Sequence, residues 1–246
     1  MIRELEDYNW FPSMLRRFQM DYIGSLVTWL KLYQPLVPVL QQLTEANQIF
    51  IIQDICSGSG IPATAMQHTV KNISNTVLSD KYPDASFINS DTIAYLKAST
   101  DVLLLVPQPA ICYTMYNGFH HFSNDEQKEL VKKMAFAKSV FLFAEILEPV
   151  FFTMIKIIFA STLLQLFAAP FIQPFSLSRL FFTYIIPVNV FTGLYDGIIS
   201  VMKSKSVKQY RKLLDGISGT DFEITVKKHN HWKGSVVSIK GNPVQR

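Results

Sequence analysis

Short apolar runs alternate with helical stretches between residues 49 and 145, and this alternation limits the possible folds more than any other feature of the sequence. The runs with the length and composition of buried strands are 49–55, 76–79, 100–106, 110–116 and 139–144. The stretches expected to form helices are 62–70, 85–95 and 123–138. Strands that alternate with helices in this way are typical of a doubly wound α/β sheet, in which neighbouring strands run parallel.

The segments before residue 49 and after residue 145 predict the elements that flank this sheet. Residues 8–43 repeat apolar side chains at helical spacing, and Pro35 and Pro38 end or bend that element. Two runs that alternate polar and apolar residues, 222–228 and 233–240, predict an antiparallel hairpin at the edge of the sheet. The chain is therefore divided into an N-terminal helical cap, an α/β core, an apolar helical insertion and a C-terminal hairpin, at 1–44, 45–148, 149–214 and 215–246.

Charge and cysteine content narrow the class of protein. The net charge of +4 is uneven, because residues 200–246 hold ten Lys or Arg and three Asp or Glu, which leaves −3 for the rest. A basic end of this kind is typical of a solvated face or of a surface that meets anionic lipid, phosphate or nucleic acid. The two cysteines, Cys56 and Cys112, form no CxxC pair, so neither zinc nor a disulfide is expected. With an acidic start and no secretory signal, we expect a cytoplasmic protein.

Residues 149–199 do not follow the alternation of strand and helix. Lys156 is the only charged residue between Glu148 and Arg179, and Phe, Ile and Leu dominate. A transmembrane helix needs about 20 mainly apolar residues, but prolines and glutamines interrupt this stretch repeatedly. Three interpretations stay open: a helical pair that covers a substrate pocket, an interfacial helix on a membrane surface, or a membrane span.

The stretch QDICSGSGIPATAM, residues 53–66, predicts a ligand site. It places closely spaced Gly58 and Gly60 between a buried strand and the start of a helix. Such a turn lets the backbone approach a ligand and directs the N–H groups of the helix N-terminus at it. The spacing Gly58-x-Gly60-x-x-Ala63, with Asp80 twenty residues after Gly60, satisfies the dinucleotide fingerprint. An adenosine ligand without a pyrophosphate, with Asp80 on its ribose, fits equally well.

Asp54 favours the second of these ligands. It lies four residues before Gly58, at the end of the strand, where we expect its side chain to face the ligand. A carboxylate at that position would repel a pyrophosphate but would suit a cationic ligand, such as a sulfonium that carries an amino-acid tail.

Several segments resemble the class I S-adenosylmethionine (SAM)-dependent methyltransferases. IIQDICSGSGIPA resembles their motif I, although Cys56 stands where the family usually has its first glycine, and TVLSDKYPD resembles motif II. STDVLLLVP is similar to the segment after the third strand, CYTMYNGFHHF followed by SNDEQKELVKKM to the fourth strand and its helix, and SVFLFAEILEP to the fifth strand. DYNWFPSMLRRFQMDYIGSL and LYDGIISVMKSKS resemble a small bacterial subgroup of this class.

The resemblance implies a Rossmann-like, doubly wound sheet of seven strands, mostly parallel, with the C-terminal hairpin as its antiparallel part. It also implies SAM as cofactor, with Asp80 on the ribose hydroxyls and Asp101 and Val102 beside the adenine. The cofactor-binding residues that we predict are Asp54, Cys56, Ser57, Gly58, Gly60, Asp80, Lys81, Asp101, Val102 and Asn117.

Histidines and acids near the ends of the later strands are the candidates for chemistry. His120 is the first choice for a general base, and Glu145 ends the fifth strand; each could instead brace a loop or pair with a neighbour. Tyr22, His121 and Asp196 are predicted to contact the acceptor, although Tyr22 could merely pack on the sheet. No Asp, Glu and His cluster has metal-ligand spacing, so no metal is predicted.

These observations predict a methyltransferase (EC 2.1.1.-) that acts on a small, apolar or lipid-like acceptor at the inner face of a membrane. The aromatic, nearly uncharged insertion motivates the apolar acceptor, and the basic residues after it motivate an anionic membrane surface. A nicotinamide-dependent oxidoreductase and a non-catalytic protein of the same fold are the alternatives. Nucleic acid is not expected as a partner, because the basic residues are not interleaved with aromatic stacking positions.

Overall fold

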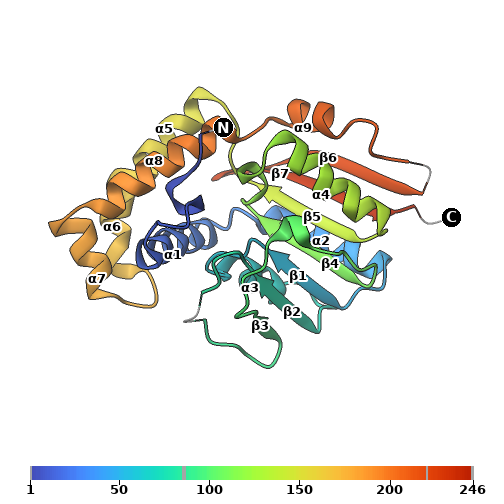
Figure 1. Ribbon diagram of the computed structural model, residues 1–246, viewed down its shortest axis with the longest axis horizontal. Coiled ribbons are helices and arrows are strands. Elements are labelled where there is room, and N and C mark those ends of the chain that lie inside the picture. Colours follow the sequence, from blue (N-terminus) through green and yellow to red (C-terminus); the bar gives the residue numbers. More distant parts are fainter. Residues whose placement is uncertain (1, 85–86, 220, 245–246) are drawn as a thin grey trace.

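The computed structural model describes residues 2–84, 87–219 and 221–244, and its centre is a seven-stranded sheet (Figure 1). The strands lie in the order β3-β2-β1-β4-β5-β7-β6. Strands β1 to β5 pair in parallel, whereas β7 is antiparallel to both β5 and β6. Their bounds are Ile51–Ile55, Asn75–Ser79, Ile93–Tyr95, Ile111–Tyr116, Val140–Glu145, Phe222–His231 and Gly234–Pro243 for β1 to β7. The predicted fold class is confirmed.

Helices cover both faces of the sheet, and the alternation of side chains along the strands decides which core each residue joins. Cys112 and Leu142 point to the core under α2 and α3, whereas Tyr113, Phe141 and Phe143 point to the core under α4 and α9. These helices span Val37–Ala46 (α2), Ile61–Gln67 (α3), Asn124–Phe136 (α4) and Val207–Leu214 (α9). Burial on both faces explains why the central strands are apolar runs without polar alternation.

The third strand is not where the sequence predicted it. The run 100–106 forms the short 3₁₀ helix η3, Val102–Leu104, and the strand is Ile93–Tyr95, inside the stretch predicted as a helix. The carboxylate of Asp101 accepts a hydrogen bond from the N–H of Leu103 at 2.9 Å, which favours the turn over an extended chain. Residues 85–86 of the expected helix lie outside the described residues.

Residues 151–203 of the apolar insertion form a lobe of helices beside the sheet (Figure 1), whereas its last helix, α9, packs on the sheet. Helix α5 continues through a π-helical turn into α6, and after a bend α7 leads into a second π-helical turn and α8. Helix α1 lies between this lobe and the sheet, in contact with both α3 and α8. The bounds are Ser13–Trp29 (α1), Phe151–Phe159 (α5), Gln165–Ala168 (α6), Leu177–Leu180 (α7) and Val188–Lys203 (α8), with the π-helical turns η5 at Ala160–Leu164 and η7 at Phe181–Ile185.

The lobe exposes many large apolar side chains. The continuous helix Phe151–Phe171 has the length and composition of a membrane span, and only 17% of its most apolar stretch is buried inside the protein. The helices Leu177–Ile185 and Val188–Lys203 are long and apolar enough to span a membrane only when they are taken as one element, and they meet at a bend of 80°. Phe151, Phe167 and Leu177 are each 75% exposed.

Candidate functional site

The glycine turn forms directly after β1. Gly58 and Gly60 have φ angles of +52° and +70°, which glycine adopts freely, and Cys56 is held at +56° in the same left-handed region. The carboxylate of Asp80 accepts a hydrogen bond from the N–H of Gly58 at 2.9 Å, and the Tyr95 hydroxyl donates to the Gly58 carbonyl at 2.8 Å. Asp80 therefore fixes the shape of the turn from the end of the neighbouring strand.

A cavity of about 1320 Å³ opens at the carboxyl ends of the strands, between the glycine turn, α1 and the lobe. Its wall contains most of the residues that the sequence predicted for cofactor and acceptor. The turn contributes Cys56, Ser57 and Gly58, and the loops after later strands contribute Asp80, Lys81, Asp101, Val102 and Asn117. The predicted acceptor residues Tyr22, His121 and Asp196 also lie in the wall.

Asp54 and Gly60 lie behind this wall. Asp54 is 1% exposed and accepts a hydrogen bond from the hydroxyl of Thr114 at 2.6 Å. Burial raises the pKa of Asp54 to about 7, although hydrogen bonds from Thr114 and Ser57 oppose the shift. Gly60 is the N-cap of α3, and a Cβ on it would lie 2.5 Å from the Leu78 side chain. Both residues pack behind the turn, on the side away from the cavity, and do not line the cavity.

His120 and Glu145 are also buried behind the wall. His120 Nδ1 lies 2.7 Å from Glu145 Oε2, while Glu145 Oε1 accepts a hydrogen bond from the Phe119 N–H at 2.7 Å. The pair thereby braces the short helix η4, Phe119–His121, against the end of β5. His120 is 1% exposed, and His121 occupies the cavity wall in its place.

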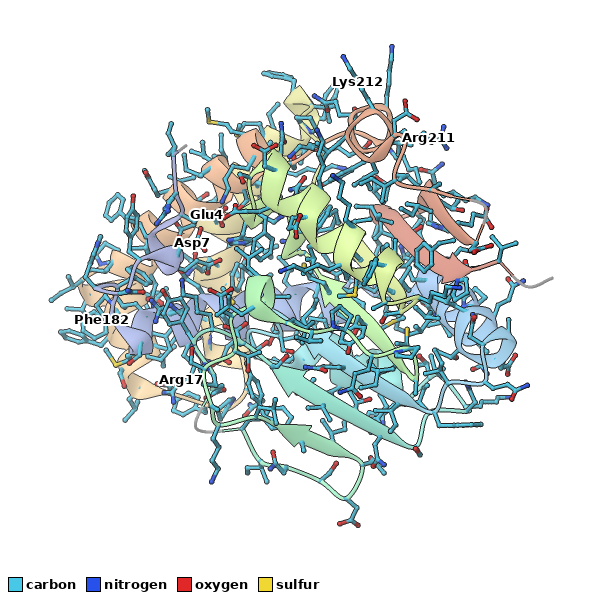
Figure 2. The ribbon with its side chains drawn as sticks, turned by 45° about the vertical axis from the view of Figure 1, so that its right-hand side comes forward. Glu4, Asp7, Arg17, Phe182, Arg211 and Lys212 are labelled. Atoms are coloured by element: carbon cyan, nitrogen blue, oxygen red, sulfur yellow. The ribbon has the colours of Figure 1, made fainter. Side chains whose placement is uncertain are left out.

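An N-terminal segment that the sequence did not single out closes one side of the cavity. Glu4 is buried and accepts hydrogen bonds from Lys203 Nζ and Ser200 Oγ, each at 2.9 Å. Asp7 Oδ1 lies 3.0 Å from His121 Nδ1. Although burial lowers the pKa of His121, the carboxylates of Glu4 and Asp7 raise it to about 10. Figure 2 shows Glu4 and Asp7 on this segment, between the lobe and the sheet.

Asp196 joins this segment to the lobe. Its Oδ1 accepts a hydrogen bond from the Leu5 N–H at 2.5 Å, and its side chain is among the buried polar groups of the cavity wall. Burial raises the pKa of Asp196 to about 7. The cavity therefore has a polar side, made of the N-terminal segment and the facing side chains of α8, next to its apolar walls.

Comparison with known proteins agrees with this architecture. No family model matches the chain, and no curated protein matches it in sequence. The structure of human N-acetylserotonin methyltransferase in complex with SAM matches 91% of this chain with a TM-score of 0.51 at 11% identity, over 55% of its own length. The chain has the fold of a class I SAM-dependent methyltransferase. The structure of TnmH matches 89% of the chain with a TM-score of 0.50 at 11% identity, over 56% of its own length. The chain thus spans about half the length of the structures that it matches.

The methyltransferase fold accounts for the position of the cavity. Strand β1 has β2 on one side and β4 on the other, so the strand order reverses beside it. In open α/β sheets such a switch point, at the carboxyl ends of the strands, is where ligands bind. The glycine turn follows β1 and therefore lies at the switch point.

Proposed function

We propose that the protein binds SAM and transfers its methyl group to a small, apolar acceptor. The observation that carries the proposal is one continuous cavity that reaches from the glycine turn and Asp80 to the apolar lobe. Its volume exceeds the roughly 300–1,000 Å³ of a typical single-ligand pocket. A cavity of that size suits a cofactor and an acceptor bound side by side.

The residues around the turn suit the nucleoside part of SAM. A Cβ on Gly58 would lie 2.9 Å from Met20 Sδ, so a larger residue at this position would push the Met20 side chain, which also lines the cavity, out of its place. Each carboxylate oxygen of Asp80 accepts one backbone hydrogen bond, from the N–H of Gly58 and of Tyr82, and keeps a further lone pair for ribose hydroxyls. Asp101 and Val102 would flank the base. SAM supplies a methyl group on a positively charged sulfur that is already a good leaving group. The protein then has to align the acceptor and exclude water, and alignment alone contributes about 7–11 kcal/mol.

The far end of the cavity suits an apolar acceptor with one polar group. Apolar side chains of α1 and α5, among them Leu26, Val27 and Ile157, line it. The Tyr22 hydroxyl donates to the Ala160 carbonyl at 2.6 Å and so ties α1 to the lobe. Asp196 would accept a hydrogen bond from a hydroxyl of the acceptor.

Cofactor binding is tested by calorimetric titration with S-adenosylhomocysteine. We expect the wild type to bind it, and Asp80→Asn to bind at least tenfold more weakly, because the amide is a poorer acceptor for ribose hydroxyls. Asp91→Asn is the matched control, since Asp91 is exposed and outside the cavity wall. Equal binding by wild type and Asp80→Asn, with both folded by circular dichroism, would refute the assignment of Asp80.

One further titration and one transfer assay separate the alternatives. Binding of NADH in preference to S-adenosylhomocysteine would support an oxidoreductase and contradict our proposal. Incubation with SAM labelled on its methyl group, followed by extraction into organic solvent with a membrane lipid extract, tests transfer to an apolar acceptor. Cofactor binding without labelled product from any lipid or aromatic alcohol would favour the non-catalytic alternative.

We further propose that the lobe rests on a lipid bilayer, from which the acceptor enters the cavity. The helix Phe151–Phe171 exposes Phe151, Phe159, Phe167 and Phe171 along its length, and residues 157–178 carry no charge. Burying apolar surface contributes about 25 cal/mol per Å², so several such rings together favour a bilayer over water. Arg211 and Lys212 lie on α9, apart from Phe182 of the lobe (Figure 2). We therefore expect anionic lipid to strengthen binding by about 1 kcal/mol per basic residue near the surface, without being required.

Flotation with lipid vesicles tests this proposal. We expect the wild type to float with both neutral and anionic vesicles, and the triple variant Phe151→Ser, Phe152→Ser, Phe167→Ser to stay behind. Phe136→Ser is the matched control, because Phe136 is 93% exposed on α4, away from the lobe. A wild type that stays in solution with both vesicle types would refute the proposal. So would a stable dimer, detected by light scattering, that the triple variant no longer forms.

A further inference from the structure

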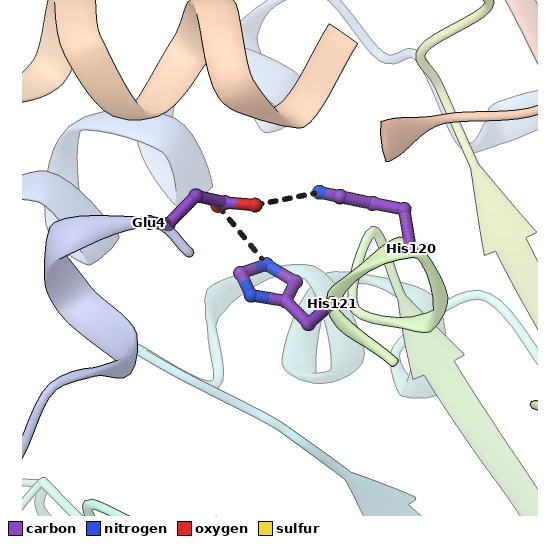
Figure 3. Close-up of side chains that lie close together, drawn as sticks. All are labelled: Glu4, His120 and His121. Atoms are coloured by element: carbon purple, nitrogen blue, oxygen red, sulfur yellow. Dashed lines mark ion pairs between the residues drawn. The ribbon is translucent and has the colours of Figure 1, made fainter. Parts of the chain in front are cut away.

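Three side chains from two distant parts of the chain converge beside the cavity. Glu4 comes from the N-terminal segment, and His120 and His121 come from η4 (Figure 3). His120 Nε2 lies 3.9 Å from Glu4 Oε1, and His121 Nε2 lies 3.4 Å from Glu4 Oε2. One ligand atom of each residue lies within 4.8 Å of the other two. Two imidazole nitrogens thus face one carboxylate.

Both imidazole rings are held by carboxylates on their other nitrogen. His120 Nδ1 lies 2.7 Å from Glu145 Oε2, and His121 Nδ1 lies 3.0 Å from Asp7 Oδ1. This is the outer-shell arrangement of metal-binding histidines, in which the second ring nitrogen is bonded to a carboxylate that fixes the orientation of the ring. It directs both Nε2 atoms at Glu4.

The Nε2 atom of His120 is the observation that points to a missing ligand. His120 is 1% exposed, and among the described residues this nitrogen has no hydrogen-bond partner. Buried polar atoms are nearly always paired, and leaving one unpaired costs about 1–3 kcal/mol. An ion between His120 and Glu4 would satisfy it.

We propose that Glu4, His120 and His121 bind one divalent transition-metal ion, with Zn²⁺ as the best match to two imidazoles and a carboxylate. Metal–ligand bonds of about 2.0–2.1 Å at tetrahedral angles place ligand atoms about 3.3 Å apart. The Nε2 atoms of His121 and His120 lie 3.4 and 3.9 Å from different oxygens of Glu4, and the ligand atoms of the three residues lie within 4.8 Å of one another, so the side chains must draw together around the ion. Glu6 Oε1 lies 3.6 Å from His121 Nε2 and is the nearest candidate for a fourth ligand. This proposal departs from the prediction that the protein has no metal.

Lys203 is the group that competes with the ion. Its ammonium lies 2.9 Å from Glu4 Oε1 and 3.5 Å from Asp7 Oδ2. In the metal-free protein it neutralises Glu4, and Asp7 offers it a second partner when the ion arrives. Because a histidine binds metal only in its neutral form, we expect the affinity for the ion to depend on pH. The ion would fasten the N-terminal segment to η4 at the side of the cavity, since Glu4 and His121 both line it.

Metal titration of the full chain, purified without a histidine tag and dialysed against EDTA, tests the proposal. With Zn²⁺ we expect one equivalent to bind and to raise the melting temperature. With Co²⁺ we expect visible absorption bands of a four- or five-coordinate ion. His121→Asn should weaken binding at least tenfold, because it removes one of the three ligands. The His121 side chain is partly exposed, so we expect the variant to fold, which circular dichroism checks. His68→Asn is the matched control, because His68 is exposed and outside the cluster.

The titrations distinguish a metal site from a cluster of side chains that only form ion pairs with one another. Ion pairs alone predict no absorption bands with Co²⁺, no stoichiometric heat with Zn²⁺ and a melting temperature that does not depend on metal. Any one of these three negative results in the folded wild type would overturn the proposal. Equal loss of binding in His121→Asn and His68→Asn would also overturn it. Glu4→Gln, checked for folding by circular dichroism, should weaken binding as His121→Asn does.

Discussion

Replacing Asp54 by Asn should remove a large part of the pH dependence of stability. Asp54 is buried beneath the glycine turn, with a hydrogen bond from Thr114 and the charge of Asp80 nearby, and its pKa is raised from 3.8 to about 7. Each pKa unit corresponds to about 1.36 kcal/mol, so ionising this group in the folded protein costs about 4 kcal/mol.

The direction in which the free energy of unfolding changes with pH follows from the number of protons that Asp54 binds in the folded and unfolded states. Below pH 3.8 the carboxyl of Asp54 is protonated in both states and contributes nothing. Between pH 3.8 and 7 the unfolded chain releases the proton and the folded protein keeps it, so the free energy of unfolding falls as the pH rises. From pH 5 to pH 8 the loss is about 3 kcal/mol, which corresponds to about 6–12 °C in melting temperature for a domain of this size.

Thermal unfolding of wild type and Asp54→Asn at pH 5 and pH 8 measures this loss. Asp21 and Asp196 also have raised pKa values, so both proteins lose stability with rising pH. The difference between the two pH-induced changes isolates Asp54, and we expect about 3 kcal/mol. A difference below about 0.5 kcal/mol would show that Asp54 is ionised in the folded protein and would refute the reasoning. Because Asp54 does not line the cavity, the affinity of Asp54→Asn for S-adenosylhomocysteine should stay within about threefold of wild type.

Two other substitutions test the packing around the cavity. Gly60→Ala should lose about 2–5 kcal/mol, because it combines a left-handed φ with a Cβ 2.5 Å from Leu78; Gly216→Ala, at φ +75° with open space around it, should lose only about 1–2 kcal/mol in the same urea titration. Asp21→Asn should lose about 3–5 kcal/mol, because it leaves Arg179 buried without the carboxylate now 3.0 Å away. Adding Arg179→Met should recover part of that loss, and no recovery in thermal unfolding would contradict a buried ion pair.

The strands that carry the glycine turn and the core could be predicted because both faces are buried. Continuous apolar runs such as 110–116 and 139–144 leave few alternatives to a central parallel strand, and β4 and β5 lie there. The edge strand β3 was missed because three residues carry too little pattern. The apolar run 100–106 was mistaken for it, although Leu104 and Val106 are each 80% exposed.

The glycine turn and its acid were predictable for a different reason. Gly58, Gly60 and Asp80 lie at fixed offsets from two strand ends, and parallel strands bring those ends to one edge of the sheet. The N-terminal segment has no such constraint. Glu4 meets Lys203 only because the lobe folds back over α1, and nothing local in the sequence encodes that distance.

The choice between His120 and His121 shows where sequence reasoning about this site ends. Both follow β4 and both lie in the 3₁₀ helix η4, where successive side chains point about 120° apart. The two rings therefore meet different surroundings: His120 is 1% exposed behind the wall, whereas His121 lines the cavity. Glu145, at the end of β5, decides between them, because its carboxylate accepts the N–H of Phe119 and binds the ring of His120. That partner is 25 residues away in sequence, so the register of η4, and with it the identity of the cavity histidine, is set by tertiary contact and not by the local pattern.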